Sequence, residues 1–405
     1  MVIIKPFQGY RYNLDKVEDF GRVITPPYDI ISPAAAENYR ARSPYNYVHI
    51  ILPQAEGDLS QYEVAGNLLR DWIGNNIFIQ DPARAIYAYA QTFCSFGTSG
   101  EEKERLSFVA LLDIAPGNDV FAHEHTLQKP FEDRLRLMEA TRAYLGLPFL
   151  LYDDSERVID GLLQAQIAGR PADVEFTDEE NVKHRLWAIT DEDTINRVVQ
   201  EMGANTCVIA DGHHRFKVAR KFYEECFENG QDPESAQFPM MCFVNSCQEA
   251  LVIWPTNRVV FNIEVPEDLL QKLGEQFDVT EENDITAALA KLRATPVVVD
   301  AARNIKNHVF VLFDSVSNKA YFLQLRDPSV LQELQPEHSE TYRKIDINVL
   351  HTLVFEGILG ISPEDQLEGT KIEYFKGDDA TLAALQETDA KYQLGFFLNA
   401  PLIQE

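Results

Sequence analysis

The amino-acid sequence predicts a mixed α+β fold, because strand-like and helix-like segments alternate irregularly along it. Apolar residues recur at helical spacing within 62–75, whereas 85–96 and 107–114 are apolar runs typical of strands. The regular alternation that indicates a doubly wound parallel sheet is not seen in the sequence. Hydrophobic residues make up 45% of the 405 residues and charged residues 25%, the balance of a folded protein with a substantial core.

The expected elements divide into two domains, 1–260 and 261–405. The first is a main α+β domain with a mixed sheet, and the second is a smaller α+β lobe whose last helix and strand return to the main domain. In the main domain we expect further strands at 149–152, 207–210, 240–245 and 251–253, and helices after 130 and after 212. In the lobe we expect a helix around 269, strands at 296–300, 309–313 and 320–325, a helical segment at 345–360 and a strand at 395–398.

The charge balance limits the classes of partner. There are 36 Lys and Arg against 64 Asp and Glu, a formal net charge of −28. Such a surface repels nucleic-acid backbones and anionic membranes, so we expect neither as a partner. The sequence has no signal-peptide pattern, no run of about 20 apolar residues and five unpaired cysteines, which predicts a cytoplasmic protein with reduced thiols.

The strongest functional pattern is Asp211-Gly212-His213-His214-Arg215, between a buried strand and a helix. The first turn of a helix has unpaired backbone N–H groups and the positive end of the helix dipole. Cationic side chains are unfavourable there unless an anion lies among them, and a glycine lets the backbone approach that anion. The pattern therefore predicts a phosphate site at Gly212, His213, His214 and Arg215. The alternative is an ordinary helix start with Asp211 as the N-cap.

A second histidine cluster, His123-Glu124-His125-Thr126, falls between an expected strand and a helix. In an extended chain His123 and His125 point the same way, but they lack the helical spacing of a zinc-binding pair. Glu124 offers an oxygen ligand for Mg²⁺ or a general base, because hard oxygen ligands suit phosphoryl chemistry. A polar loop with satisfied histidines explains the cluster equally well.

Several isolated polar residues are further candidates. Asp29 follows two prolines on a stiff turn and could present its carboxylate to a cleft, or cap a turn that runs through Ser32. Surface ion pairs are the plainer explanation for charged residues on a helix. The residues that could hold the substrate or a second phosphate are His123, Lys129, Asp133, Arg134 and Arg258.

These motifs occur in an order that resembles the bacterial and archaeal family known as domain of unknown function 1015. The resemblance spans nearly the whole chain, and the string from Ala210 to Arg215 is its most specific part. Two positions depart from the family pattern: Phe216 stands where tyrosine is usual, and Asn257 where histidine is frequent, which puts a role for Asn257 in doubt. The segments that carry the resemblance are 26–31, His123-Glu124 with Thr126, Asp133-Arg134-Leu135, 209–216 and Pro255-Thr256-Asn257-Arg258.

The Asp-Gly-His-His-Arg string also resembles the phosphate-binding motif of the ParB/sulfiredoxin-like superfamily, which includes nucleotide-dependent kinases of free serine. The resemblance implies a ParB/sulfiredoxin-like phosphate-binding element in which residues 212–215 hold nucleotide phosphates. It also implies an acidic residue that activates the substrate hydroxyl, which would be Asp29 or Glu124, with Asp211 as the third choice. ATP or ADP would donate the phosphoryl group, with Mg²⁺ as cofactor.

The leading hypothesis is therefore a nucleotide- and Mg²⁺-dependent kinase that phosphorylates the hydroxyl of a small metabolite, with free L-serine as the first candidate. The sequence contains neither a phosphate-binding P-loop nor the protein-kinase signatures. The alternatives are a non-catalytic nucleotide-binding regulatory module, and a metal-dependent hydrolase built on the two histidine pairs. A homodimer stays open, because the sequence pattern does not separate an apolar association face from a core face.

Overall fold

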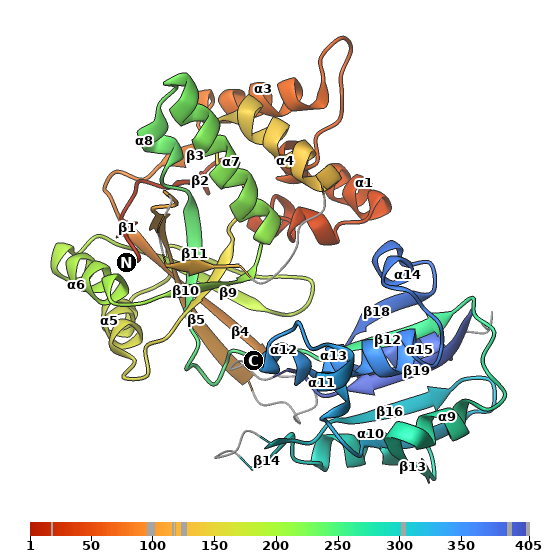
Figure 1. Ribbon diagram of the computed structural model, residues 1–405. Coiled ribbons are helices and arrows are strands. Elements are labelled where there is room, and N and C mark those ends of the chain that lie inside the picture. The colour runs from red at the N-terminus through yellow and green to blue at the C-terminus, as the bar shows by residue number, and fades with distance from the viewer. Residues whose placement is uncertain are drawn as a thin grey trace. The chain divides into compact units, whose positions relative to one another are not determined.

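The computed structural model describes residues 1–17, 19–94, 102–115, 117, 119–122, 128–300, 305–386 and 391–401. The chain divides into two compact units, Met1–Leu251 and Val252–Glu405, each with its own β-sheet and covering helices (Figure 1). The α+β class predicted from the sequence is confirmed, with a large mixed sheet and smaller additional sheets.

In the first unit the described strands form a nine-stranded mixed sheet. Two pairs are parallel, β10 with β6 and β11 with β7, and the other neighbours are antiparallel. Across the sheet the order is β6 (Val120–Phe121), β10 (Cys207–Asp211), β7 (Phe149–Tyr152), β11 (Met240–Asn245), β5 (Glu102–Leu112), β4 (Ile86–Cys94), β9 (Lys183–Ile189) and β8 (Val174–Thr177), and β1 (Ile4–Lys5) also pairs with β5.

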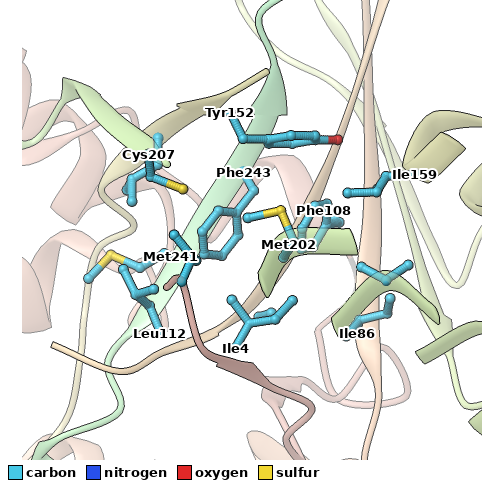
Figure 2. Close-up of a cluster of buried hydrophobic side chains, with 14 of the residues drawn as sticks. Ile4, Ile86, Phe108, Leu112, Tyr152, Ile159, Met202, Cys207, Met241 and Phe243 are labelled. Carbon is cyan, nitrogen blue, oxygen red and sulfur yellow. The ribbon is translucent and has the colours of Figure 1, made fainter. Parts of the chain in front are cut away.

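A small buried cluster that includes Tyr87, Val109 and Cys242 lies on one face of this sheet, and the larger core cluster of the unit lies on the other face. Helices α5 (Val158–Ile167), α6 (Glu192–Gly203) and α7 (His213–Asn229) contribute to the larger cluster. Phe108 and Phe243, from neighbouring strands, stack with their ring centroids 5.0 Å apart, and Met202 belongs to the same buried cluster (Figure 2). Burial of these side chains fixes which face of each strand points inward.

Further helices and a short hairpin complete the first unit. Helix α3 begins at a capping box between Ser60 and Glu63, and it buries Leu69 and Trp72, as its apolar spacing predicts. Helix α4 packs against both α3 and α7 (Figure 1). The elements are β2 (Tyr10–Tyr12), η1 (Phe20–Arg22), η2 (Tyr28–Ile30), α1 (Pro33–Arg42), α2 (Val48–Ile51), α3 (Gln61–Gly74), β3 (Phe78–Gln80), α4 (Gln128–Thr141) and α8 (Pro233–Ala236).

The second unit is built on a six-stranded antiparallel sheet with helices on both faces. The strand order is β13 (Phe277–Glu282), β17 (Lys319–Leu325), β16 (Val309–Asp314), β19 (Tyr392–Leu398), β12 (Thr256–Phe261) and β18 (Ile372–Lys376). The remaining elements are α9 (Leu269–Gln276), α10 (Ile285–Ala294), β14 (Val298–Asp300), β15 (Ile305–Lys306), α11 (Val330–Leu334), α12 (Glu340–Arg343), α13 (Asp346–Leu350), the π-helix η3 (His351–Glu356), α14 (Pro363–Glu368) and α15 (Asp378–Leu385).

The structure differs from the expected domain layout at both ends of this second unit. The unit begins at Val252, before the expected boundary at 260, because β12 pairs with β18 and β19. Segment 251–253 was expected as a strand, but it is not a strand in the structure and lies at the boundary between the units. The C-terminal strand β19 pairs with β12 and β16 instead of returning to the first unit, and α15 packs on the same sheet.

Two further expectations concern the environment of the chain. Among the described residues, no helix combines the length and the apolar character that crossing a bilayer requires. The five cysteines are free, and Cys207, Cys226 and Cys242 are buried. Burial raises the pKa of Cys207 to about 12, so this thiol stays protonated and packs as an apolar group.

Asn257 joins three parts of the second unit. Its amide nitrogen donates to Gly377 O at 3.1 Å, Asp378 Oδ1 at 3.0 Å and Thr381 Oγ1 at 3.0 Å, and its amide oxygen accepts from Leu398 N at 3.3 Å. The side chain is fully buried on β12, so it bridges α15 and β19 from inside the sheet. These hydrogen bonds explain the asparagine at this position by a role in folding.

We predict that Asn257→Ala destabilises the second unit by roughly 1–3 kcal/mol, because it leaves buried hydrogen-bonding groups unsatisfied. Hydrogen–deuterium exchange read by mass spectrometry should show faster exchange in peptides that cover β12 and β19. Asn283→Ala, at an exposed position of the same unit, is the matched control and should leave exchange unchanged. Equal exchange in both variants would contradict the bridging role.

Candidate functional site

A tight turn joins β10 to α7. Asp211 is the last residue of β10, His213 is the first of α7, and Gly212 between them has φ 86°, in the left-handed region. A Cβ atom on Gly212 would lie 3.0 Å from Pro148 Cα and 3.0 Å from Arg215 Nε. Only glycine satisfies both the backbone angle and this close approach.

Arg215 fixes the turn against the loop that precedes β7. Its Nη1 donates to Leu147 O at 2.6 Å, and its Nη2 forms an ion pair with Asp211. The side chain is 14% exposed, so the guanidinium is largely enclosed by these partners. The same two chain segments are also joined by strand pairing, because Asp211 on β10 lies opposite Phe149 on β7. Arg215 thus holds the turn in shape, and its predicted contact with a phosphate stays a prediction.

The start of α7 has no side-chain cap. Gly212 is the N-cap residue, so the alternative in which Asp211 caps the helix is wrong. The helix is 17 residues long and has no acidic residue in its first turn. His213 is buried, with 5% exposure, and His214 is half-buried. The first backbone N–H groups of this long helix therefore follow a glycine, whose missing Cβ leaves room for a ligand beside them. This arrangement favours the binding of an anion.

Tyr28, on η2, lies among charged groups from three of the sequence motifs. Burial raises the pKa of Tyr28, while nearby charges act in both directions: the guanidinium groups of Arg134 and Arg215 lower it, and the carboxylates of Asp29 and Asp133 raise it. Charges act on a pKa mainly within about 4–6 Å. The Arg134 guanidinium carbon lies 4.4 Å from the centroid of the Tyr28 ring. Arg134 of the 133–135 segment thus contacts Tyr28 of the 26–31 segment, and the charge of Arg215 in the 209–216 segment acts on the same side chain.

Asp133 and Arg134, on α4, form hydrogen bonds with residues of neighbouring segments. Arg134 Nη1 donates to Ile51 O at 2.6 Å, and its Nε donates to Asp133 Oδ2 at 2.9 Å. Asp133 Oδ1 also accepts from Tyr62 Oη at 2.9 Å and from Gln61 Nε2 at 3.3 Å. Both side chains are therefore committed to protein partners, which supports a positioning role near Tyr28.

The other predicted site residues do not form one described cluster. The Asp29 carboxylate is exposed, and we find no hydrogen bond or ion pair to it among the described residues. Arg258 belongs to the second unit and is buried there. His123, Glu124 and His125 lie outside the described residues, as does the side chain of Lys129 at the start of α4.

The structure adds one residue that the sequence analysis missed. Arg105, on β5, has a buried Nε atom without a hydrogen-bond partner in the described structure, while its Nη2 donates to Gln91 Oε1 at 2.5 Å. Its guanidinium carbon lies 5.0 Å from the centroid of the Phe149 ring, and no ion pair to a carboxylate is found among the described residues. Burial lowers its pKa. A single arginine in an alternating strand looks solvent-facing, so the sequence gave no signal for it.

A second orphaned group lies in the Thr25-Pro26-Pro27 segment. The Oγ1 atom of Thr25 is buried and has no hydrogen-bond partner in the part of the chain that the structure describes. The two prolines that follow lack backbone N–H groups, which removes the nearest donors that a threonine hydroxyl usually finds. A buried polar atom without a partner is unusual in native proteins and is compatible with a ligand contact.

The metal-dependent alternative was tested on the described residues. In these, no group of three or more His, Cys, Asp or Glu side chains could hold a metal ion. The histidine pair at 123 and 125 lies outside that part of the chain.

Sequence comparison assigns the chain to a family. Residues 4–348 match the model of a family described as protein of unknown function (DUF1015). The chain belongs to this family. The resemblance stated from the motifs is therefore confirmed, and the match includes all four motif-bearing segments of the first unit and Arg258. Among curated proteins, no match was found.

Solved structures give weaker likenesses. A mutant of a free serine kinase in complex with AMP is 13% identical, with 71% of this chain and 78% of that chain covered and a TM-score of 0.32. A second mutant of a free serine kinase, in complex with ADP, is 13% identical, with 71% and 77% covered and a TM-score of 0.31. A conserved hypothetical protein from Pyrococcus furiosus is 12% identical, with 71% and 79% covered and a TM-score of 0.30. TM-scores this low do not establish a common fold.

We predict that Gly212→Ala is more destabilising than Gly230→Ala. Both glycines have left-handed φ angles, 86° and 63°, at the two ends of α7, but a Cβ on Gly230 meets nothing within 4 Å. The matched control carries only the backbone strain, while Gly212→Ala adds overlap with Pro148, which costs roughly 1–3 kcal/mol more. Urea unfolding followed by circular dichroism measures the difference. Equal losses would mean that the close approach to Pro148 is not needed.

Proposed function

We propose that the protein is a nucleotide-dependent kinase that phosphorylates the hydroxyl group of a small metabolite, with free L-serine as the first candidate substrate. The observation that carries the proposal is the turn at Gly212, where a 17-residue helix begins without a side-chain cap or a Cβ in the way. Helix N-termini of this kind bind phosphate groups. The resemblance of residues 211–215 to the phosphate-binding motif of free serine kinases supports the same conclusion.

Phosphoryl transfer requires position and charge neutralisation more than covalent chemistry. In the proposed site, the backbone N–H groups of residues 213–215 bind nucleotide phosphates, and Arg215 holds the turn through Asp211 and Leu147. Asp29 is the proposed base that accepts the hydroxyl proton. It is favoured over Asp211, because the Asp211 carboxylate is already paired with Arg215. Glu124 remains the other candidate.

Mg²⁺ fits this site as an ion shared with the nucleotide. The carboxylates that act on Tyr28 are those of Asp29 and Asp133, and Asp133 is committed to Arg134, Tyr62 and Gln61. Because Asp29 is the proposed base, the carboxylate proposed to ligate the ion is that of Glu124, which lies outside the described residues. Mg²⁺ commonly takes one or two carboxylates and completes its shell with phosphate oxygens and water. When bound, it would neutralise charge on the transferred phosphoryl group.

Arg105 supports a substrate with a carboxylate. Its guanidinium contacts the ring of Phe149, whose backbone pairs with Asp211, and Leu147 two residues earlier holds Arg215. A guanidinium with a buried, unpartnered Nε can bind a planar oxyanion by donating two parallel hydrogen bonds to it. An amino acid such as L-serine carries that group beside its hydroxyl, whereas a neutral sugar does not.

The non-catalytic alternative uses the same phosphate site but needs neither a base nor a group for the substrate carboxylate. A regulatory module would bind nucleotide and transfer no phosphoryl group to any hydroxyl compound. The metal-dependent hydrolase predicts a transition metal that stays bound after purification without chelators. These outcomes separate the three classes by binding, turnover and metal content.

We predict that Asp29→Asn binds nucleotide with a dissociation constant within about threefold of the wild type and lowers kcat at least about 100-fold, because a general base contributes roughly 10²–10⁴-fold. Isothermal titration calorimetry and a coupled turnover assay measure the two quantities. Asp15→Asn, at another exposed aspartate of the same unit, is the control and should change neither. Normal turnover in Asp29→Asn would remove Asp29 as the base.

We predict that Arg105→Gln raises KM for L-serine by about 10–100-fold and leaves nucleotide affinity unchanged, since a charged hydrogen bond to the substrate is lost. Steady-state kinetics with varied L-serine at saturating nucleotide tests this. Arg185, on β9 of the same sheet, also has a buried Nε without a described partner, but it forms an ion pair with Glu104. Arg185→Gln is therefore the control and should leave KM near the wild-type value. An unchanged KM in Arg105→Gln would exclude the carboxylate contact.

A further inference from the structure

The second unit contains a buried cation without a carboxylate partner. Arg258, on β12, is 5% exposed. Its Nη1 donates to Thr256 O, its Nε lies 3.4 Å from His351 Nε2, and the Tyr374 ring centroid is 5.4 Å from its guanidinium carbon. Among the described residues, we find no aspartate or glutamate that forms an ion pair with it. Its contacts are therefore one carbonyl, one imidazole and one aromatic face.

Such a position is costly for a guanidinium. Removing a charge from water is strongly unfavourable unless a counter-charge or several hydrogen bonds replace the solvent. Burial lowers the pKa of Arg258 to about 10, which reflects this penalty. One carbonyl acceptor and an aromatic ring offset only part of it, because a guanidinium has five N–H donors. The arrangement lacks an anion.

His351 contacts the same guanidinium from the helix η3, which packs on the sheet. It is the first residue of the π-helix η3, a form of helix that occurs frequently at functional sites. Burial and the adjacent Arg258 charge lower the pKa of His351 to about 4, against a raising effect from Gln366, so the imidazole is neutral at pH 7. A histidine and an arginine in contact, without an acid beside them, repel each other whenever the histidine is protonated.

The cluster lies at the edge of the sheet. Strand β18 is the last strand in the described order, and its Tyr374 and Lys376 lie opposite Arg258 and Thr256 of β12. Paired residues of an antiparallel sheet point to the same face, so Lys376 is on the side of Arg258. Tyr374 is 44% exposed and Lys376 is exposed, so one aromatic ring separates Arg258 from solvent.

We propose that Arg258, His351 and Lys376 form a binding site for a small oxyanion, a carboxylate or a phosphate group, behind the ring of Tyr374. The guanidinium would hold two oxygens of the anion in parallel hydrogen bonds, and the Lys376 ammonium would approach from the solvent side. The bound anion would compensate the buried charge and favour the protonated form of His351. The site is assembled within the second unit, so it does not depend on the proposed kinase activity.

The His351 imidazole reports on this site alone. We expect its carbon-bound proton and Cε1 signals, identified by their absence in His351→Gln, to shift saturably when inorganic phosphate or acetate is added to the full-length protein at pH 6.5. The direction should be toward imidazolium, because a neighbouring anion raises the pKa of a histidine. Sodium chloride at equal ionic strength should not reproduce the shift. The arm that saturates at lower concentration distinguishes phosphate from carboxylate as the bound group.

Variants locate the anion. In Arg258→Lys the dissociation constant should rise about tenfold, because the planar fork that binds two oxygens is lost while the charge remains. Lys376 is exposed, so folding should tolerate Lys376→Gln. This variant should weaken anion binding several-fold and leave the His351 signal of the anion-free protein unchanged. No shift of His351 with either anion in the wild-type protein would overturn the proposal. A shift that is unchanged in both variants would also overturn it, since these residues would not hold the anion.

Discussion

The close packing of Gly212 against Pro148 is the constraint on which the candidate site depends. The left-handed turn allows β10 to end beside Phe149 and α7 to begin at once. A Cβ atom on Gly212 would lie 3.0 Å from Pro148 Cα, so a larger residue is disfavoured there. Arg215 then locks the two chain segments together through Leu147 and Asp211. The helix start, the strand pairing and the guanidinium support one another, so the geometry of the proposed phosphate site follows from folding contacts within the chain.

The acidic surface contrasts with the interior that these contacts create. The chain has a formal net charge of −28, yet Arg105 and Arg258 are enclosed without a described carboxylate partner. Both lie on β-strands beside aromatic rings, Phe149 and Tyr374. Guanidinium groups held in this way keep donors available for a planar oxyanion. Small anionic metabolites thus match the described chemistry better than polyanions, which the surface charge repels.

Local sequence signals predicted many elements but not their long-range arrangement. Strands 149–152 and 240–245 were predicted at their observed bounds, since a short apolar run is a local property. No strand was predicted at 256–261, and the domain boundary was set at 260, because the β19 partner of β12 lies more than a hundred residues away and no local pattern encodes that pairing. The turn at Gly212 was predicted from its glycine and its histidines. Arg105 was not, because only the packing of β5 reveals that its guanidinium is enclosed.

The central claim is that the Gly212 turn places a nucleotide phosphate for transfer to a small hydroxyl compound. Phosphorus NMR of wild-type protein, Gly212→Ala and Gly230→Ala, each with Mg²⁺, ATP or ADP and L-serine, tests it most directly. The account predicts a phosphoserine signal in the wild type and in Gly230→Ala, and its loss in Gly212→Ala under conditions where all three proteins remain folded. A phosphoserine signal of equal strength in Gly212→Ala, or none in the wild type with any hydroxylated amino acid, would contradict the account.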